Sequence, residues 1–281
     1  MTSLLLSVPV VAKESSRKDF PRSWNPDVFA EFSVTAEREV ELNRAEARYF
    51  HKKILQAKEP NFDLNLGYDS FQSKDDLNGP DGEKLDVLCK WLICQAKQRG
   101  VPTREICYET DFVCYRGLLT RIASTPYDQR EGWKLCAVRI GSTIFLCEFQ
   151  TEKKKQEIAE RTDRQKLMCY WGFKFEQFAT TDRPNSEPNT SEAVSNLKEF
   201  DVVLRAKLGE NEDGVRLMFA AETDCFDAEG NYLELKTVTS QNHQLAGNFW
   251  MMKAMKWWLQ SYLAGIQRII VGFRTWQGLY G

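Results

Sequence analysis

The second half of the chain contains short apolar runs that end in charged or turn-forming residues, the pattern of buried and half-buried β-strands. Gly141-Ser142 separates two of these runs and predicts the turn of a hairpin. The strands predicted in this way are 135–139, 143–149, 200–208, 215–221 and 269–273, the last of which we expect to be the final strand.

Between the strands lie segments with helical spacing of apolar residues. The predicted helices are 34–56 (one charged helix or two short ones), 84–99 ended by Gly100, 167–178 and 247–263, in which Met251, Met255 and Trp258 form an apolar core stripe. Polar residues predict loops at 70–81 and 182–191. This order predicts an α+β (mixed α/β) fold, with 1–25 as an N-terminal arm and 26–281 as a single domain.

Two acidic motifs carry the candidate chemistry, Glu222-Thr223-Asp224 and Glu234-Leu235-Lys236. Side chains two positions apart on a strand share a face, so Glu222 lies beside Asp224 and Glu234 beside Lys236. Antiparallel strands joined through the loop 227–231 would bring three carboxylates and one ammonium together. Clustered carboxylates repel one another unless a cation lies among them, and oxygen ligands suit Mg²⁺ or Mn²⁺. The pattern is typical of a PD-(D/E)xK metal nuclease, which cuts phosphate esters.

A structural interpretation of these residues stays open. Glu-x-Lys is common on strands, and cross-strand Glu/Lys pairs often lie on sheet surfaces. Glu176 lies among aromatic residues in the predicted helix 167–178, either as a further metal ligand or on the wet face of that helix. Arg116 lies in the strand-like segment 111–120, where it binds either a phosphate or the carboxylate of a structural ion pair.

Taken together, these segments resemble, in order, the four motifs of the DXO-type decapping exoribonuclease family. The motifs are Phe112-Val113-Cys114-Tyr115-Arg116-Gly117, Gly172-Phe173-Lys174-Phe175-Glu176, Glu222-Thr223-Asp224-Cys225 and Glu234-Leu235-Lys236-Thr237. Further agreement lies in Thr125-Pro126-Tyr127, Glu131-Gly132-Trp133, Lys256-Trp257-Trp258-Leu259-Gln260-Ser261 and Val271-Gly272-Phe273-Arg274. The resemblance runs from Pro60 to the C-terminus.

The resemblance implies two β-sheets flanked by helices, with the active site in a pocket between them. It implies metal-dependent hydrolysis of RNA 5′ ends in RNA quality control: removal of the 5′ triphosphate, of incompletely methylated caps and of NAD caps. In several members 5′-3′ exoribonuclease action follows. Family members usually continue beyond the equivalent of Gly281, so we expect residues 26–281 to form a catalytic domain that is short at its C-terminus.

The resemblance also assigns roles to individual residues. It makes Glu176, Asp224, Glu234 and the main-chain carbonyl of Leu235 the ligands of a pair of Mg²⁺ or Mn²⁺ ions. Glu222 would hold metal-bound water or the second ion. Lys236 would lie near the scissile phosphate and the attacking water, and Arg116 and Gln260 would face the same pocket.

Composition narrows the function classes. The net charge of −2 argues against a protein that coats nucleic acid, although a metal site can still recruit the phosphates of RNA. The chain has only His51 and His243, which disfavours a His-dependent hydrolase. Eight cysteines without a Cys-x-x-Cys pair predict reduced, buried thiols and no zinc site. Reduced thiols indicate an intracellular protein, nuclear or cytoplasmic. No segment is long and apolar enough to span a membrane. We also expect a monomer.

Other functions remain as alternatives. The chain could be a catalytically weak family member that binds RNA or a partner, such as a 5′-3′ exoribonuclease. A DNA nuclease of the restriction type would use Asp224, Glu234 and Lys236 but would leave Arg116 and Glu176 unexplained. No Nudix box is present, which disfavours Nudix-type decapping.

Overall fold

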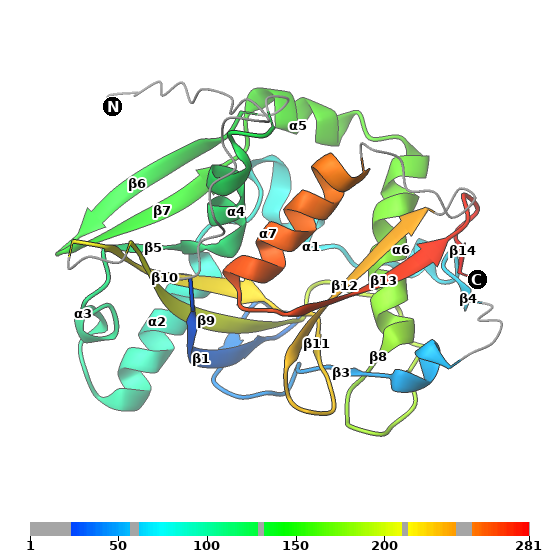
Figure 1. Ribbon diagram of the computed structural model, residues 1–281, viewed down its shortest axis with the longest axis horizontal. Coiled ribbons are helices and arrows are strands. Elements are labelled where there is room, and N and C mark those ends of the chain that lie inside the picture. The colour runs from blue at the N-terminus through cyan, green and yellow to red at the C-terminus, as the bar shows by residue number, and fades with distance from the viewer. Residues whose placement is uncertain (1–23, 57–61, 129–131, 210–212, 240–248, 281) are drawn as a thin grey trace.

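Two seven-stranded mixed β-sheets lie side by side and are flanked by helices (Figure 1). The computed structural model describes residues 24–280, apart from 57–61, 129–131, 210–212 and 240–248. The predicted N-terminal arm up to residue 23 and His243 therefore lie outside the described residues. No helix in the described part is both long and apolar enough to cross a bilayer.

The first sheet, called sheet A, has the strand order β2-β1-β9-β10-β5-β7-β6. Its strands β9 and β10 are antiparallel, with Asp201 opposite Glu222, whereas β10 and β5 are parallel. The strands are β1 (Asp27–Val34), β2 (Val40–Glu41), β5 (Phe112–Tyr115), β6 (Lys134–Ile140), β7 (Thr143–Phe149), β9 (Glu199–Leu208) and β10 (Val215–Glu222).

The second sheet, called sheet B, has the strand order β4-β14-β13-β12-β11-β3-β8. Most of its strands are short, and the long parallel pair β12 and β13 forms its centre. The strands are β3 (Tyr49–Phe50), β4 (Phe62–Asp63), β8 (Thr180–Thr181), β11 (Cys225–Phe226), β12 (Tyr232–Thr239), β13 (Arg268–Arg274) and β14 (Leu279–Tyr280).

The helices cover the sheets through three apolar clusters. On sheet A, Trp91 of α2 packs with Phe32 and Met218, and on sheet B, Trp171 and Phe175 of α6 pack with the leucines of β12. A third cluster lies where α4 and β11 meet the other face of sheet A.

The α-helices are α1 (Lys74–Asn78), α2 (Asp86–Arg99), α3 (Thr103–Ile106), α4 (Arg116–Ser124), α5 (Glu152–Ala159), α6 (Asp163–Ala179) and α7 (Met255–Leu263). Three 3₁₀ turns cover Lys52–Leu55, Tyr68–Ser70 and Gly79–Asp81, and a π-helical turn covers Phe249–Ala254.

Local signals explain several element ends. Gly100 ends α2 in the left-handed conformation, with φ of +66°, as predicted. Thr162 and Gln165 form a capping box at the start of α6. The predicted hairpin of β6 and β7 is confirmed, with Gly141 at φ of +63° in its turn.

The helix predicted at 34–56 is wrong. Residues up to Val34 belong to β1, and β2, β3 and a 3₁₀ turn follow. Charged residues gave this segment a helical appearance, but Phe32 and Val34 are fully buried in the core and β1 pairs with β9. Tertiary pairing therefore overrode local propensity.

Smaller predictions also needed correction. The polar loop 70–81 contains α1, capped by the side chain of Ser73. Strand 269–273 is not the last, because β14 follows it and pairs with β4. Trp258 is 42% exposed and stacks on Tyr262, so it is not a core residue as predicted.

Candidate active site

Four separate segments meet where the chain passes from sheet A to sheet B. Strand β10 ends at Glu222 in sheet A, and β11 begins in sheet B after two intervening residues. Asp224 lies in this short crossing. The hairpin predicted between the two acidic motifs is therefore wrong in one respect: β12 pairs with β11 and not with β10. The turn itself is where it was predicted, and Asp227 closes it by accepting hydrogen bonds from the main chain.

The central cluster consists of Arg116, Glu176, Asp224, Glu234 and Lys236. Glu234 and Lys236 come from β12, Arg116 begins α4 directly after β5, and Glu176 lies on α6. The spacing of two on β12 places Glu234 and Lys236 on one face, while Leu233 and Leu235 pack into the core on the other. The structure thus brings together the acids, the lysine and the arginine that the sequence singled out.

Hydrogen bonds and ion pairs hold the cluster. Glu234 is 2% exposed; its Oε1 accepts a hydrogen bond from the Lys236 ammonium, and its Oε2 lies 3.4 Å from Nη1 of Arg116. The Oδ2 of Asp224 accepts a hydrogen bond of 2.5 Å from the main-chain N–H of Leu235. Arg116 therefore forms an ion pair with a carboxylate, as the structural interpretation predicted. Binding of a phosphate by Arg116 stays a prediction.

The acids of the cluster outnumber its cations. Burial, followed by the charge of Asp224, raises the pKa of Glu176 well above its usual range. Burial and the charge of Glu234 raise the pKa of Asp224 to about 7. Burial alone would lower the pKa of Lys236, but Asp224 and Glu234 outweigh it and raise that pKa. A bound divalent cation would relieve this repulsion.

The donor set suits a hard cation, since Glu176, Asp224 and Glu234 all offer oxygen atoms. Among the described residues, however, no three Asp, Glu, His or Cys side chains already surround a common point. Lys236 and Arg116 contact the two oxygens of Glu234, and the Leu235 N–H contacts one oxygen of Asp224. Each carboxylate oxygen has a second lone pair, so these contacts leave acceptor sites for a cation.

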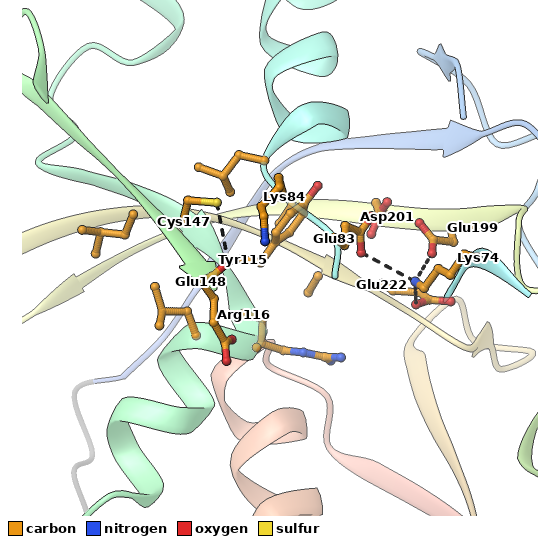
Figure 2. A pocket seen from close by; sticks show the side chains of 16 residues that line it. Lys74, Glu83, Lys84, Tyr115, Arg116, Cys147, Glu148, Glu199, Asp201 and Glu222 are labelled. Carbon is orange, nitrogen blue, oxygen red and sulfur yellow. Dashed lines mark hydrogen bonds and ion pairs between the residues drawn. The ribbon is translucent and has the colours of Figure 1, made fainter. Parts of the chain in front are cut away.

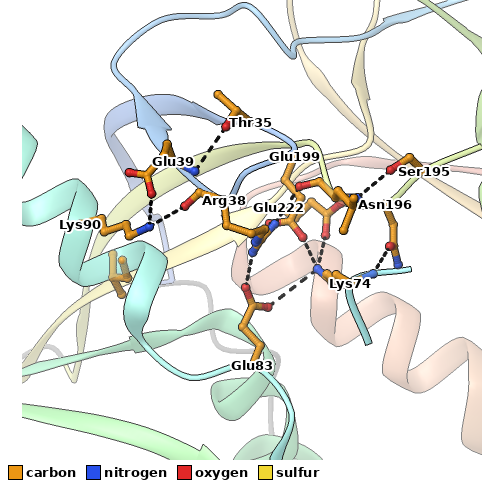
Figure 3. Close-up of polar contacts among 12 residues, drawn as sticks. Thr35, Arg38, Glu39, Lys74, Glu83, Lys90, Ser195, Asn196, Glu199 and Glu222 are labelled. Carbon is orange, nitrogen blue, oxygen red and sulfur yellow. Dashed lines mark hydrogen bonds and ion pairs between the residues drawn. The ribbon is translucent and has the colours of Figure 1, made fainter. Parts of the chain in front are cut away.

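Glu222 belongs to a second set of charges, the Lys74 network. The ammonium of Lys74 lies 3.7 Å from Oε2 of Glu222 and 3.8 Å from Oε2 of Glu83, and it donates a hydrogen bond to Glu199 (Figure 3). Arg38 lies on the far side of the same acids, 2.9 Å from Oε2 of Glu199 and 2.5 Å from Oε1 of Glu83. Lys74 thus connects the N-terminal part of the chain to Glu222.

Sequence reasoning missed this network. Glu199 and Asp201 are two positions apart at the start of β9, whose predicted range, 200–208, began one residue later. Their shared face could have been inferred from this spacing. Nothing local singles out Lys74 or Arg38, because their partners lie far away in the sequence. Lys74 also starts a helix in a segment that was predicted to be a loop.

Cavities reach the cluster from different sides. One, of about 290 Å³, is lined by Arg116 and Glu222 and extends over sheet A (Figure 2). Another, of about 310 Å³, is lined by Glu176, Leu235 and Lys236. Gln260 lies on α7 in a third cavity, beside Gly117 and Lys256, and does not line either of the first two. Its predicted role at the active site stays a prediction.

Comparison with known proteins agrees with this arrangement. The family model described as RAI1-like PD-(D/E)XK nuclease matches residues 24–280. Decapping nuclease dom-3 of Caenorhabditis elegans is 38% identical over 256 residues, which cover 89% of this chain and 63% of that protein. The decapping and exoribonuclease protein of Homo sapiens is 33% identical over 270 residues, covering 92% of this chain and 65% of that protein. The chain thus spans slightly less than two thirds of the length of these curated relatives.

Solved structures share the fold. The crystal structure of Candida albicans Rai1 has a TM-score of 0.71 at 24% identity, covering 92% of this chain and 71% of that one. The structure of S. pombe Rai1 in complex with 3′-FADP has a TM-score of 0.66 at 26% identity, covering 91% and 72%. These likenesses confirm the predicted class of two mixed sheets flanked by helices. The chain belongs to the family of RAI1-like PD-(D/E)XK nucleases.

Proposed function

We propose that this protein is a divalent-metal-dependent hydrolase of RNA 5′ ends that acts in RNA quality control. Its reactions would be removal of an incompletely methylated cap, an NAD cap or a 5′ triphosphate, followed by 5′-3′ exoribonuclease action. The observation that carries the proposal is the meeting of Glu176, Asp224, Glu234, Lys236 and Arg116 where the chain crosses between the sheets. The names of the curated relatives, decapping nucleases and exoribonucleases, support it.

The acidic residues would bind the metal, and the basic residues would contact the phosphate. Glu176, Asp224 and Glu234 would hold Mg²⁺ or Mn²⁺, with the carbonyl of Leu235 and the carboxylate of Glu222 as further ligands. When bound, the metal lowers the pKa of a water molecule and offsets the negative charge of the phosphate. Lys236, which pairs with Glu234, would offer its ammonium where negative charge develops on the phosphoryl oxygens. Arg116 offers a planar guanidinium that can bind two of those oxygens.

The 5′ end itself would bind between the cavities that reach the central cluster. S. pombe Rai1 was solved with 3′-FADP, a dinucleotide with a diphosphate bridge. A similar bridge in this protein would pass Arg116 and Glu222, which line the first cavity. We further propose that the protein is an intracellular monomer, nuclear or cytoplasmic, and that a 5′-3′ exoribonuclease is its partner.

The test is digestion of end-labelled RNAs that carry a monophosphate, a triphosphate, an unmethylated cap, a methylated cap or NAD. Each is incubated with Mg²⁺ or Mn²⁺ and with the wild-type protein or Glu234→Ala. We expect metal-dependent release from at least one substrate other than the methylated cap, and none with Glu234→Ala. If a folded wild-type protein leaves all five intact but still binds RNA, it is a binding module and the proposal is wrong.

A further inference from the structure

The cavity beside Arg116 has one strongly acidic wall. Glu199 and Asp201 lie two positions apart on β9, and Glu222 is directly opposite Asp201 on β10, so all three share a face of sheet A. Glu83 joins them from the loop before α2. Figure 2 shows these four acids gathered at one side of the cavity, with Arg116 and Glu148 further along it. We call this space the acidic cavity.

The cations of the Lys74 network do not reach every acid. Lys74 and Arg38 bind Glu83 and Glu199, and Lys74 also approaches Glu222. Asp201 is only 4% exposed, and its carboxyl group forms no hydrogen bond or ion pair with any residue that the structure describes, although the charge of Lys74 attracts it. Burial and the charge of Glu199 raise the pKa of Asp201, so hydrogen-bond donors from a ligand would stabilise its ionised form.

The rest of the lining suits a flat ring. Leu85, Leu118 and Leu146 are apolar, and the Tyr115 hydroxyl accepts a hydrogen bond of 3.2 Å from the N–H of Leu88, which fixes the aromatic ring. The other charged groups already have partners. Glu148 pairs with Arg121, and Lys84 donates to the main chain of Asp81. A volume of about 290 Å³ is at the small end of ligand pockets and fits a single nucleoside.

We propose that the acidic cavity binds a guanine base, with Asp201 accepting hydrogen bonds from N1–H and the 2-amino group. Guanine is the nucleobase that presents two N–H donors side by side, which one carboxylate can accept together. Arg116, at the same cavity, is placed to contact the phosphate of that nucleotide. The assignment rests on the proposed function, since it makes the cavity the recognition site for the 5′-terminal guanosine.

The binding of mononucleotides tests the guanine assignment without requiring catalysis. Dissociation constants for GMP, IMP and AMP are measured by calorimetry on the whole metal-free chain. IMP differs from GMP only by the missing 2-amino group, so we expect GMP to bind at least about tenfold more tightly than IMP, the effect of one hydrogen bond to a charged acceptor. Equal affinities for GMP and IMP in the wild-type protein would overturn the proposal, whatever any variant does.

The variant Asp201→Asn replaces an acceptor by a group that also donates, at nearly constant shape. We expect GMP and IMP to bind Asp201→Asn equally, while Asp111→Asn, a surface acid paired with Arg216, keeps the wild-type ratio. Retention of that ratio in a folded Asp201→Asn protein would refute the role of Asp201.

A nicotinamide ring also carries an amide N–H₂, so nicotinamide mononucleotide is the competing source of the same chemistry. Tighter binding of this nucleotide than of GMP would overturn the guanine assignment. The guanine assignment and the proposed function can fail separately. If the protein digests RNA but shows no preference for GMP, only the guanine assignment is refuted. If it prefers GMP but digests no RNA, only the hydrolase function is refuted.

Discussion

The ammonium of Lys74 lies 3.7 Å from Oε2 of Glu222, although Lys74 begins a short helix near the N-terminal part of the fold and Glu222 ends a strand of sheet A. Burial alone would lower the pKa of Lys74, but Glu222 and Glu199 outweigh it and raise that pKa. Lys74 thereby sets the position and charge of an acid that borders both the central cluster and the acidic cavity.

Replacing Lys74 should therefore increase the electrostatic repulsion among the acids that surround it. We expect Lys74→Met to lower the free energy of unfolding by about 3 kcal/mol, because removing one partner leaves buried charge unpaired. Lys74→Arg should retain most of the stability. Urea denaturation measures both, with Lys53→Met as the control. Its exposed pair with Glu187 should contribute less than about 1 kcal/mol. Equal losses for Lys74→Met and Lys53→Met would contradict the network.

Metal binding should stabilise the folded protein. The repulsion among Glu176, Asp224 and Glu234 is relieved only in the folded state, so Mg²⁺ or Mn²⁺ should raise the melting temperature. At a concentration 100 times the dissociation constant the gain is about 2.7 kcal/mol. Glu234→Gln should remove the effect and Glu148→Gln should not, since Glu148 pairs with Arg121 outside the cluster. A thermal shift of equal size in all three proteins would rule out a cation at this site.

Lys236 should act on the reaction more than on metal binding. We expect Lys236→Met to reduce kcat at least about 100-fold, since it removes a positive charge from the developing phosphoryl charge. The metal-induced thermal shift should persist, because Glu234 loses a competing partner. Lys166→Met, an exposed lysine on α6, is the control and should keep wild-type rates. A variant that loses the thermal shift together with activity would make Lys236 a structural residue.

Gly272 determines how closely α6 approaches sheet B. A Cβ atom at this position would lie 2.6 Å from Cε2 of Phe175, next to Glu176 on α6. Gly272→Ala should therefore destabilise the protein by about 1–3 kcal/mol, the usual cost of overpacking. Gly172→Ala is the matched control, because its Cβ would meet nothing within 4 Å, and it should stabilise the helix by up to about 1 kcal/mol. Chemical denaturation of the two variants would show shifts of opposite sign.

The cysteines should differ widely in reactivity. All eight are free thiols, but the prediction that they are buried holds only in part: Cys114 is buried and Cys169 is exposed. Burial raises the pKa of Cys114 to about 12, so its reactive thiolate is scarce at pH 8. Iodoacetamide should therefore label Cys169 in the native protein and Cys114 only after unfolding, as mass spectrometry of peptides would reveal. Native labelling of Cys114 at a similar rate would contradict the fold around β5.

The sequence by itself determined the features that repeat over short distances. Short apolar runs marked β9 and β10. The spacing of two placed Glu234 and Lys236 on one face, because side-chain direction follows the local backbone. Gly141 and Gly100 marked a turn and a helix end for the same reason. The order of the four motifs indicated the family, which the match over residues 24–280 confirms.

Tertiary structure alone decided which of these elements lie together. It placed β10 and β12 in different sheets, so that Asp224 occupies the crossing between them, and it turned the charged segment after Val34 into strands. It also brought Lys74 to Glu222 and left the Asp201 carboxyl group without a hydrogen bond from any described residue. Strand pairing and burial of charge depend on residues distant in sequence, so no local pattern encodes them.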